Sequence, residues 1–285
     1  MIREAGAADR NAVVAFLLGH VDGAMFPLSN LRNHGLALAD FASDHLHAMR
    51  VWIMGPGLRG IIGVTRQGMV MLMLPGGGDL AGLGAALQGM TLMGAVGPAA
   101  HVRHVLGVLG LARRPTVLNN DEPGFTLDLT MLRVPAHPEA KLIAPGQDER
   151  ARLVAFRTAY QVEVLGTDAS KAAARAEVDI DGYLAQDSHR LLQVDGQPVA
   201  MTGFNATLPE IVQIGGVYTP LALRNRGYAR LAVALHLQEV RRKGVTRAVL
   251  FAANAAAARA YQAIGFQPAA PVGLVLFDGV QRVSA

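Results

Sequence analysis

The segment from Val217 to Arg230 constrains the fold of this chain most, because it joins a strand to a helix through a glycine. The β-branched and apolar residues from Ile211 to Val217 predict a strand, and Pro220 ends it because proline cannot donate to a ladder. An apolar pattern of helical period then runs from Leu231 to about Lys243. The N–H groups of a first helical turn favour an anion, and Gly227 would let that anion approach the backbone. The segment therefore predicts a phosphate-binding loop.

A second motif lies downstream and consists of a strand followed by a short helix. The predicted strand covers Thr246 to Ala252, where β-branched and apolar residues dominate. The predicted helix covers Ala255 to Ala263, with Asn254 suited to its N-cap and Gly265 as its stop signal. Tyr261 lies near the end of this helix, where it could simply pack its ring against a sheet, and Asn254 could serve only as the cap.

The order of these two motifs resembles the GNAT superfamily of N-acetyltransferases, over roughly Lys141 to Phe277. The resemblance rests on Arg224-x-x-Gly227-x-Ala229 before a long helix, and on the tyrosine-bearing helix after the next strand. It implies an α/β (α+β) fold with a mixed sheet flanked by helices, and acetyl-CoA as cosubstrate. It also implies direct transfer of an acetyl group to a primary amine of a small molecule or peptide. A non-catalytic module that binds or senses coenzyme A or acyl-CoA is the alternative.

The resemblance also assigns residues to the coenzyme. It matches the backbone amide of Val217 to the thioester carbonyl, where Gly215-Gly216 would permit a bulge that splays the strand, or would merely thin it. It implies that Tyr261 protonates the departing thiolate, since a phenol of pKa about 10 stays protonated at neutral pH. The predicted catalytic residues are thus Tyr261 and Val217. The predicted coenzyme-binding residues are Val217, Tyr218, Thr219, Arg224, Asn225, Arg226, Gly227, Tyr228, Ala229, Arg230 and Asn254.

A general base cannot be assigned in the same way. Gln213 stands where some members of the family carry a catalytic glutamate, and an amide cannot accept a proton at neutral pH. Glu210 and Glu163 could act through water, although each is also an ordinary candidate for a solvated surface carboxylate. Gln213 is therefore the best argument for the non-catalytic alternative. We expect the acceptor to bind between about Arg157 and Gly182.

The first half of the chain repeats this order of elements without the motif. In the first half we predict a helix over 9–19, a further helical region up to residue 45, and helices over 79–88 and 99–111. The strands predicted there cover 50–54, 60–65, 69–74, 91–96 and 125–132. In the second half we predict further strands over 141–144, 191–195, 198–205 and 272–277, and helices over 148–165 and 169–185. Gly76 to Gly78 stand where the second half has its motif, and a flexible turn explains them better than a phosphate site.

These repeated elements predict two tandem GNAT-like domains. The segment Pro135 to Pro138 marks the join, because proline disfavours helix at itself and at the preceding residue. We predict a degenerate domain over residues 1–136 that lacks the cofactor motif, and an acetyltransferase domain over residues 137–285 that binds acetyl-CoA.

Composition and charge exclude several other classes. The absence of cysteine from the 285 residues excludes disulfides, thiol nucleophiles and cysteine-ligated zinc. The net charge is +4 and no basic run with interleaved aromatic residues occurs, so nucleic acid is not an expected partner. His45-x-His47 and His101-x-x-His104 lack accompanying carboxylates, so no metal site is predicted. We find neither a signal-peptide pattern nor an unbroken apolar span of about 20 residues. We therefore expect a cytoplasmic protein that does not bind membranes, and leave a homodimer open.

Overall fold

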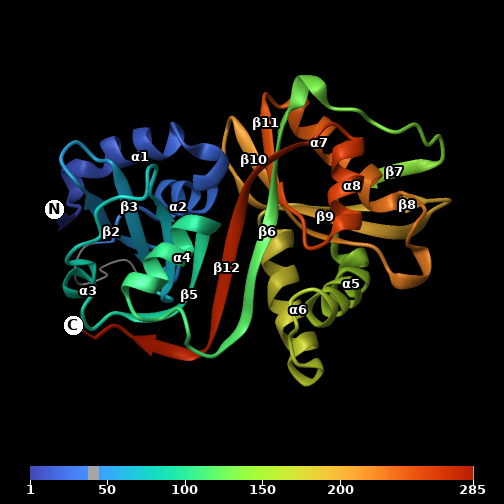
Figure 1. Ribbon diagram of the computed structural model, residues 1–285. Coiled ribbons are helices and arrows are strands. Elements are labelled where there is room, and N and C mark those ends of the chain that lie inside the picture. Colours follow the sequence, from blue (N-terminus) through green and yellow to red (C-terminus); the bar gives the residue numbers. More distant parts are fainter. Residues whose placement is uncertain (38–44, 285) are drawn as a thin grey trace. The chain divides into compact units, whose positions relative to one another are not determined.

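The computed structural model describes residues 1–37 and 45–284. Contacts divide the chain into two compact units, one formed by Met1–Pro123 with Ala270–Ala285 and the other by Gly124–Ala269. Each unit is a mixed sheet with helices packed on its faces (Figure 1). The mixed α/β class predicted from the sequence is confirmed.

The strands of the first unit lie in the order β1-β2-β3-β4-β5-β12. Their bounds are β1 (Ile2–Glu4), β2 (Met49–Met54), β3 (Gly60–Thr65), β4 (Met69–Met73), β5 (Thr91–Pro98) and β12 (Gln267–Arg282). The pair β4 and β5 is parallel, and the other neighbouring pairs are antiparallel. The helices are α1 (Arg10–Leu18), which follows a 3-10 turn, α2 (Val21–His34), α3 (Leu83–Ala86) and α4 (Ala99–Val108).

The central strands of this unit are buried on both faces, which explains their continuous apolar runs. Val70 and Leu72 of β4 point into the core that Val102 of α4 also enters. Met71 points to the opposite face, where the side-chain amide of Asn30 in α2 donates to its sulfur at 3.4 Å. The alternation of side chains along β4 thus joins the sheet to helices on both faces.

The strands of the second unit lie in the order β6-β11-β10-β9-β8-β7. Their bounds are β6 (Thr116–Asp128), β7 (Ala140–Ile143), β8 (His189–Val194), β9 (Gln197–Thr207), β10 (Ile211–Tyr218) and β11 (Arg247–Phe251). The pair β10 and β11 is parallel, and the other neighbouring pairs are antiparallel. The helices are α5 (Arg150–Glu163), α6 (Ala169–Ala185), α7 (Tyr228–Arg242) and α8 (Ala255–Ala263).

Two pairs of helices cover the two faces of the second sheet (Figure 1). On one face, Phe156 of α5 and Ile180 of α6 pack with Met201 of the sheet. On the other face, Leu237 of α7 packs with Ile214 of β10, and α8 contributes Tyr261 to the same core. Because side chains alternate along β10, residues near its end reach both cores.

The closing strands of the two repeats are exchanged. β6 follows α4 in the chain, yet it pairs with β11 of the second unit, from Arg247↔Asp128 to Phe251↔Gly124. β12 follows α8, yet it pairs with β5 of the first unit, from Val272↔Pro98 to Arg282↔Thr91. The chain therefore passes from one unit to the other within β6 and again within β12.

Because of this exchange, the boundaries of the compact units differ from the predicted boundary between the two domains. The predicted join at residues 136 and 137 falls inside the second unit, which begins at Gly124. The prolines at 135 and 138 do lie between β6 and β7, where one set of elements ends and the next begins. Local composition marks that point, whereas pairing with distant strands decides where the compact units begin and end.

Most predicted elements are present, and the exceptions have local causes. α6 coincides with the helix predicted over 169–185, and β3 with the strand predicted over 60–65. The strand predicted over 125–132 was wrong at both ends: β6 begins at Thr116 in a polar stretch, and Asp128 caps a 3-10 turn after it. The helix predicted over 79–88 is reduced to α3, because Gly82 is left-handed at φ 84°. β1 was not predicted, and the part of the predicted helical region on residues 38–44 lies outside the described residues.

Candidate functional site

The strand β10 carries a bulge at its glycines. Its pairing with β9 passes from Gly215↔Gly203 to Tyr218↔Met201, so β10 advances three residues while β9 advances two. Gly216 is left-handed at φ 62°, a conformation that favours glycine. Gly216 and Val217 together lie opposite one residue of β9, which is a β-bulge. The bulge predicted at the two glycines is confirmed.

β10 also separates from its parallel neighbour just before the bulge. Pairing with β11 runs from Ile211↔Arg247 to Gln213↔Val249. β10 nevertheless continues to Tyr218, and β11 continues to Phe251. The two strands therefore diverge beyond Gln213, and the backbone near Val217 lies where a ligand can contact it.

The glycine loop, defined as residues 224–230, leads from β10 towards α7. Gly227 is the N-cap of α7 and is left-handed at φ 80°, and Asn225 is also left-handed at φ 64°. α7 then runs for 15 residues. Because Gly227 has no capping side chain, the N–H groups of the first turn are available to an anion, and the helix dipole favours one there. Arg226 and Arg230 are exposed in the same loop, so the local charge also suits a phosphate.

Arg224 contacts the end of α5. Its guanidinium forms an ion pair with Glu163 at the end of α5, and its Nε donates to the carbonyl oxygen of Thr219 at 3.0 Å. The hydroxyl of Tyr218 donates to the other carboxylate oxygen of Glu163 at 2.8 Å. These bonds, that from Arg224 first, lower the pKa of Glu163, which makes it a poor proton acceptor at neutral pH. Glu163 therefore positions the glycine loop, rather than having the features of a general base.

Tyr261 and Asn254 have the local roles that the sequence left open. Tyr261 is buried, and its ring meets that of Phe266 edge-on with centroids 6.0 Å apart. Burial raises the pKa of the Tyr261 phenol, and Tyr160 of α5 raises it further. The Oδ1 atom of Asn254 accepts a hydrogen bond from the backbone N–H of Ala257 at 2.9 Å, so Asn254 is the N-cap of α8. The high pKa keeps the Tyr261 hydroxyl protonated and able to donate.

Several buried polar atoms near the bulge lack hydrogen-bond partners. They are Nε2 of His189, Oε1 of Gln213 and Oγ1 of Thr219. Burying such an atom costs free energy unless a partner satisfies it. A bound molecule that reached the end of β10 would supply such partners, so the residues present fit a polar ligand there.

His189 is the residue that sequence reasoning missed. It is the first residue of β8 and lies in register with Gly203 of β9, which in turn pairs with Gly215 of β10. Its imidazole stacks on the ring of Tyr183 in α6, with centroids 3.6 Å apart. Gly203 and Gly215 are distant from it in the sequence, so the local signal was only a histidine entering a strand, six residues after a tyrosine.

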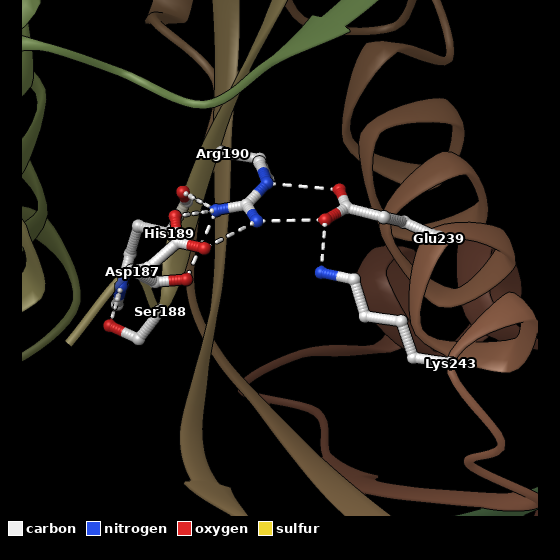
Figure 2. A network of polar contacts seen from close by, with 6 residues as sticks. All are labelled: Asp187, Ser188, His189, Arg190, Glu239 and Lys243. Atoms are coloured by element: carbon white, nitrogen blue, oxygen red, sulfur yellow. Dashed lines mark hydrogen bonds and ion pairs between the residues drawn. The ribbon is translucent and has the colours of Figure 1, made fainter.

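A network of charges fastens β8 to α7 (Figure 2). Arg190 donates from Nε and Nη2 to the two carboxylate oxygens of Glu239, at 2.9 and 2.8 Å. Its Nη1 donates to Asp187 at 2.7 Å, and Lys243 donates to Glu239 at 2.9 Å. The Arg190 side chain is only 5% exposed, and its hydrogen bonds are the main cause that lowers the pKa of Glu239 to about 2. The network holds α7, whose first turn borders the glycine loop, against the sheet.

The first unit does not reproduce the glycine loop. After β4, Gly76, Gly77 and Gly78 are all left-handed, at φ 77°, 83° and 64°. The helix that follows is α3, which has four residues. So short a helix aligns few amides, and its dipole is correspondingly small. The backbone of the second unit is therefore better suited to hold a phosphate.

Comparisons with known proteins agree with this geometry. Residues 156–266 match the model of the acetyltransferase (GNAT) family. A GCN5-related N-acetyltransferase from Kribbella flavida is similar in structure, with a TM-score of 0.57 and 20% identity, covering 90% of this chain and 96% of that one. A tandem GNAT protein from the clavulanic acid biosynthesis pathway has a TM-score of 0.54 and 16% identity, covering 100% and 99%. No curated protein matches the chain in sequence.

A third likeness extends over the whole chain in the same way. A GCN5-related N-acetyltransferase from Sphaerobacter thermophilus has a TM-score of 0.56 and 14% identity, covering 100% of this chain and 96% of that one. The predicted tandem GNAT fold is thus confirmed. Within residues 1–37 and 45–284, no helix is long and apolar enough to cross a membrane. The same residues contain no group of three or more His, Cys, Asp or Glu side chains that could hold a metal ion.

Proposed function

Residues 156–266 form a domain of the GNAT acetyltransferase family, and from that premise we propose that the second unit acetylates an amine. The acetyl group of acetyl-CoA passes directly to a primary amine of a small molecule or a peptide. The observation that carries this proposal is the bulge at Gly216, where β10 diverges from β11 beside the glycine loop. The backbone N–H of Val217, which would contact the thioester, and those of the glycine loop, which would contact a phosphate, then lie at the two ends of one short segment.

The chemistry divides among a few groups. As the amine attacks the thioester carbonyl, negative charge grows on the oxygen, and the N–H of Val217 at the bulge stabilises it. The C–S bond then breaks, and the Tyr261 hydroxyl gives its proton to the departing thiolate. Burial keeps Tyr261 protonated until that moment, because it raises the pKa of the phenol.

The coenzyme lies along the end of β10 and into the glycine loop. Its pantetheine arm follows Val217, Tyr218 and Thr219, where Oγ1 of Thr219 is buried without a partner. Its pyrophosphate meets the amides of Asn225, Arg226, Gly227, Tyr228, Ala229 and Arg230. Arg224 acts indirectly, by tying the loop to Glu163, and Asn254 contacts the coenzyme near Tyr261 while it caps α8.

A non-catalytic coenzyme A or acyl-CoA module is the second candidate, and one observation favours it. Gln213 is 3% exposed on the strand that ends at the bulge, and its Oε1 atom has no partner. An amide there can bind a ligand but cannot accept a proton. The site would then hold the coenzyme without turning it over.

Two measurements separate these functions. Calorimetry with acetyl-CoA tests binding, and thiol release with a panel of primary amines tests transfer. Binding with amine-dependent thiol release supports the enzyme, and binding without release for any amine supports the module. A lack of binding would contradict both.

The stoichiometry of binding tests the role assigned to the first unit. Its short helix and three left-handed glycines suit a degenerate domain that holds no coenzyme. We therefore expect one acetyl-CoA per chain at saturation. Two equivalent sites would contradict this role.

A further inference from the structure

The imidazole of His189 reaches across β9 to the bulge of β10. A Cβ atom built on Gly203, its partner in β9, would collide with the ring. A Cβ built on Gly216 would lie 2.7 Å from Nε2, and the three atoms nearest to it all belong to the His189 ring. Both glycines thus leave room for this imidazole. A nitrogen atom at that point above Gly216 would lie within hydrogen-bond distance of Nε2.

The two ring nitrogens of His189 have different surroundings. Nδ1 lies 2.9 Å from the hydroxyl oxygen of Ser188, whereas Nε2 is buried and has no partner. When Nδ1–H donates to Ser188, Nε2 carries the lone pair. The stack on Tyr183 then fixes the plane of the ring. In this tautomer the unused lone pair is aimed at the bulge.

The groups that face His189 keep it uncharged. They are Tyr183 of α6, Arg157 of α5, His236 of α7 and Arg190 of its own strand. Burial first, and then His236, Arg157 and Arg190, hold the pKa of His189 well below its usual value. At neutral pH the imidazole is thus uncharged. It can accept a hydrogen bond, but it is a weak base.

We propose that Nε2 of His189 accepts the hydrogen bond, and then the proton, of the acceptor amine as that amine attacks the thioester. This assignment rests on the acetyltransferase function proposed above. It would make His189 a catalytic residue beside Val217, whose N–H faces the oxygen of the same carbonyl. It also supplies the proton acceptor that Gln213 cannot be.

The step balances in atoms and charge. The nitrogen of the neutral amine forms the new C–N bond and becomes cationic, and Nε2 takes one of its protons. The C–S bond breaks with its electron pair on sulfur, and the thiolate takes a proton from Tyr261. The products are the amide and the free thiol of coenzyme A, and the proton on His189 passes to Tyr261 or to solvent.

The weakness of this base determines the protonation state in which the acceptor reacts. A ring held neutral among Arg157, Arg190 and His236 does not remove a proton from an alkylammonium ion. It can accept one once the C–N bond has formed, because the nitrogen is then strongly acidic. The acceptor therefore reacts as its free base.

The test compares His189→Gln with His20→Gln. His20 is the control, because its Nδ1 also has a hydrogen-bond partner, the carbonyl oxygen of Phe16 at 2.9 Å, but it lies between α1 and α2 of the first unit. Glutamine keeps a polar atom near each ring position and cannot take up a proton. For His189→Gln we expect kcat/KM to fall by about 10²- to 10⁴-fold with little change in KM or in the Kd for acetyl-CoA. His20→Gln should keep kcat/KM at the parent level.

The pH profile and a measurement on the unmodified protein complete the test. In the parent, kcat/KM should rise with pH until the amine is fully neutral. In protein labelled with nitrogen-15, the Nε2 resonance of His189 should shift when coenzyme A and a competent amine are added together. This second readout applies even when His189→Gln does not fold.

The outcomes are distinct. A folded His189→Gln protein with parental kcat/KM, or an Nε2 resonance that ignores the amine, would overturn the role of His189 and leave the acetyltransferase function standing. Acetyl-CoA binding without thiol release for any amine in the parent protein would overturn both. Loss of turnover with intact coenzyme binding in His189→Gln, and not in His20→Gln, would support the assignment.

Discussion

Arg224 in the glycine loop is joined to Glu163 at the last residue of α5, so the segment before α7 is tied to a helix on the opposite face of the sheet. Both side chains are more than a third exposed, so the pair adds at most about 1 kcal/mol to stability. The ion pair should instead keep the glycine loop in its binding conformation before the coenzyme arrives.

Glu163→Gln should therefore weaken acetyl-CoA binding with little loss of stability. The variant keeps the size of the side chain but loses the charge that holds Arg224. We expect Kd to rise by up to about fivefold, equivalent to about 1 kcal/mol, and Tm to stay nearly constant. Calorimetry and thermal unfolding measure the two quantities, with the exposed Glu139→Gln as the control. An unchanged Kd would show that the pair does not order the loop.

Gly227→Val should abolish coenzyme binding while the unit stays folded. Valine is strained at φ 80°, and its Cβ would lie 3.1 Å from Nε of Arg230, among the groups proposed to meet the pyrophosphate. Calorimetry with acetyl-CoA checks this prediction. Gly107→Ala is the control, because Gly107 lies in α4 with open space around the added atom. Parental affinity in a folded Gly227→Val protein would remove the loop from the site.

Tyr261→Phe should slow turnover and leave coenzyme affinity nearly unchanged. The ring that packs near Phe266 is retained, and only the hydroxyl is lost. The rate should fall by about 10²- to 10⁴-fold, less if water replaces the donor. Thiol release at saturating acetyl-CoA is the measurement, and a parental rate would assign Tyr261 to packing alone.

Glu239→Gln should destabilise the second unit. The change leaves Arg190 buried with Asp187 as its remaining carboxylate partner. Breaking a buried ion pair typically costs about 3–5 kcal/mol, and the smaller value of about 2 kcal/mol is expected here because Glu239 is 31% exposed. Denaturant unfolding measures the loss, with Glu177→Gln on the exposed face of α6 as the control. Equal stability of the two variants would contradict the structural role of the network.

The free energy of unfolding should fall as the pH is lowered from 6.5 towards about 3, because the folded protein keeps His236 from binding a proton. Burial is the main cause that lowers the pKa of His236 to about 3, below its ordinary value of 6.5. Between these values the unfolded chain binds a proton that the folded chain does not, so unfolding is favoured as the pH falls. The slope is at most about 1.4 kcal/mol per pH unit for each such group. Denaturant unfolding of parent and His236→Leu from pH 7 to 4 should show a shallower slope for the variant, and parallel slopes would refute it.

The sequence predicted the local parts of the site and missed the parts that distant pairing creates. The bulge could be foreseen because two adjacent glycines interrupt a β-branched strand, and the N-cap of α8 because asparagine precedes an alanine-rich run. The role of His189 depends on Gly203 and Gly216 lying beside it, which no local pattern encodes. The ion pair of Glu163 likewise required that the end of α5 lie near the glycine loop.

The exchange of closing strands also affects how the chain can acquire its structure. The strand that completes the first unit, β12, follows all the other described strands in the chain, so β5 lacks this neighbour until those strands have been made. β11 similarly depends on β6, which is made long before it. Separate expression of the two repeats would leave β5 and β11 with open edges, which invite pairing with a second molecule. Each half of this protein thus needs a strand from the other half to complete its sheet.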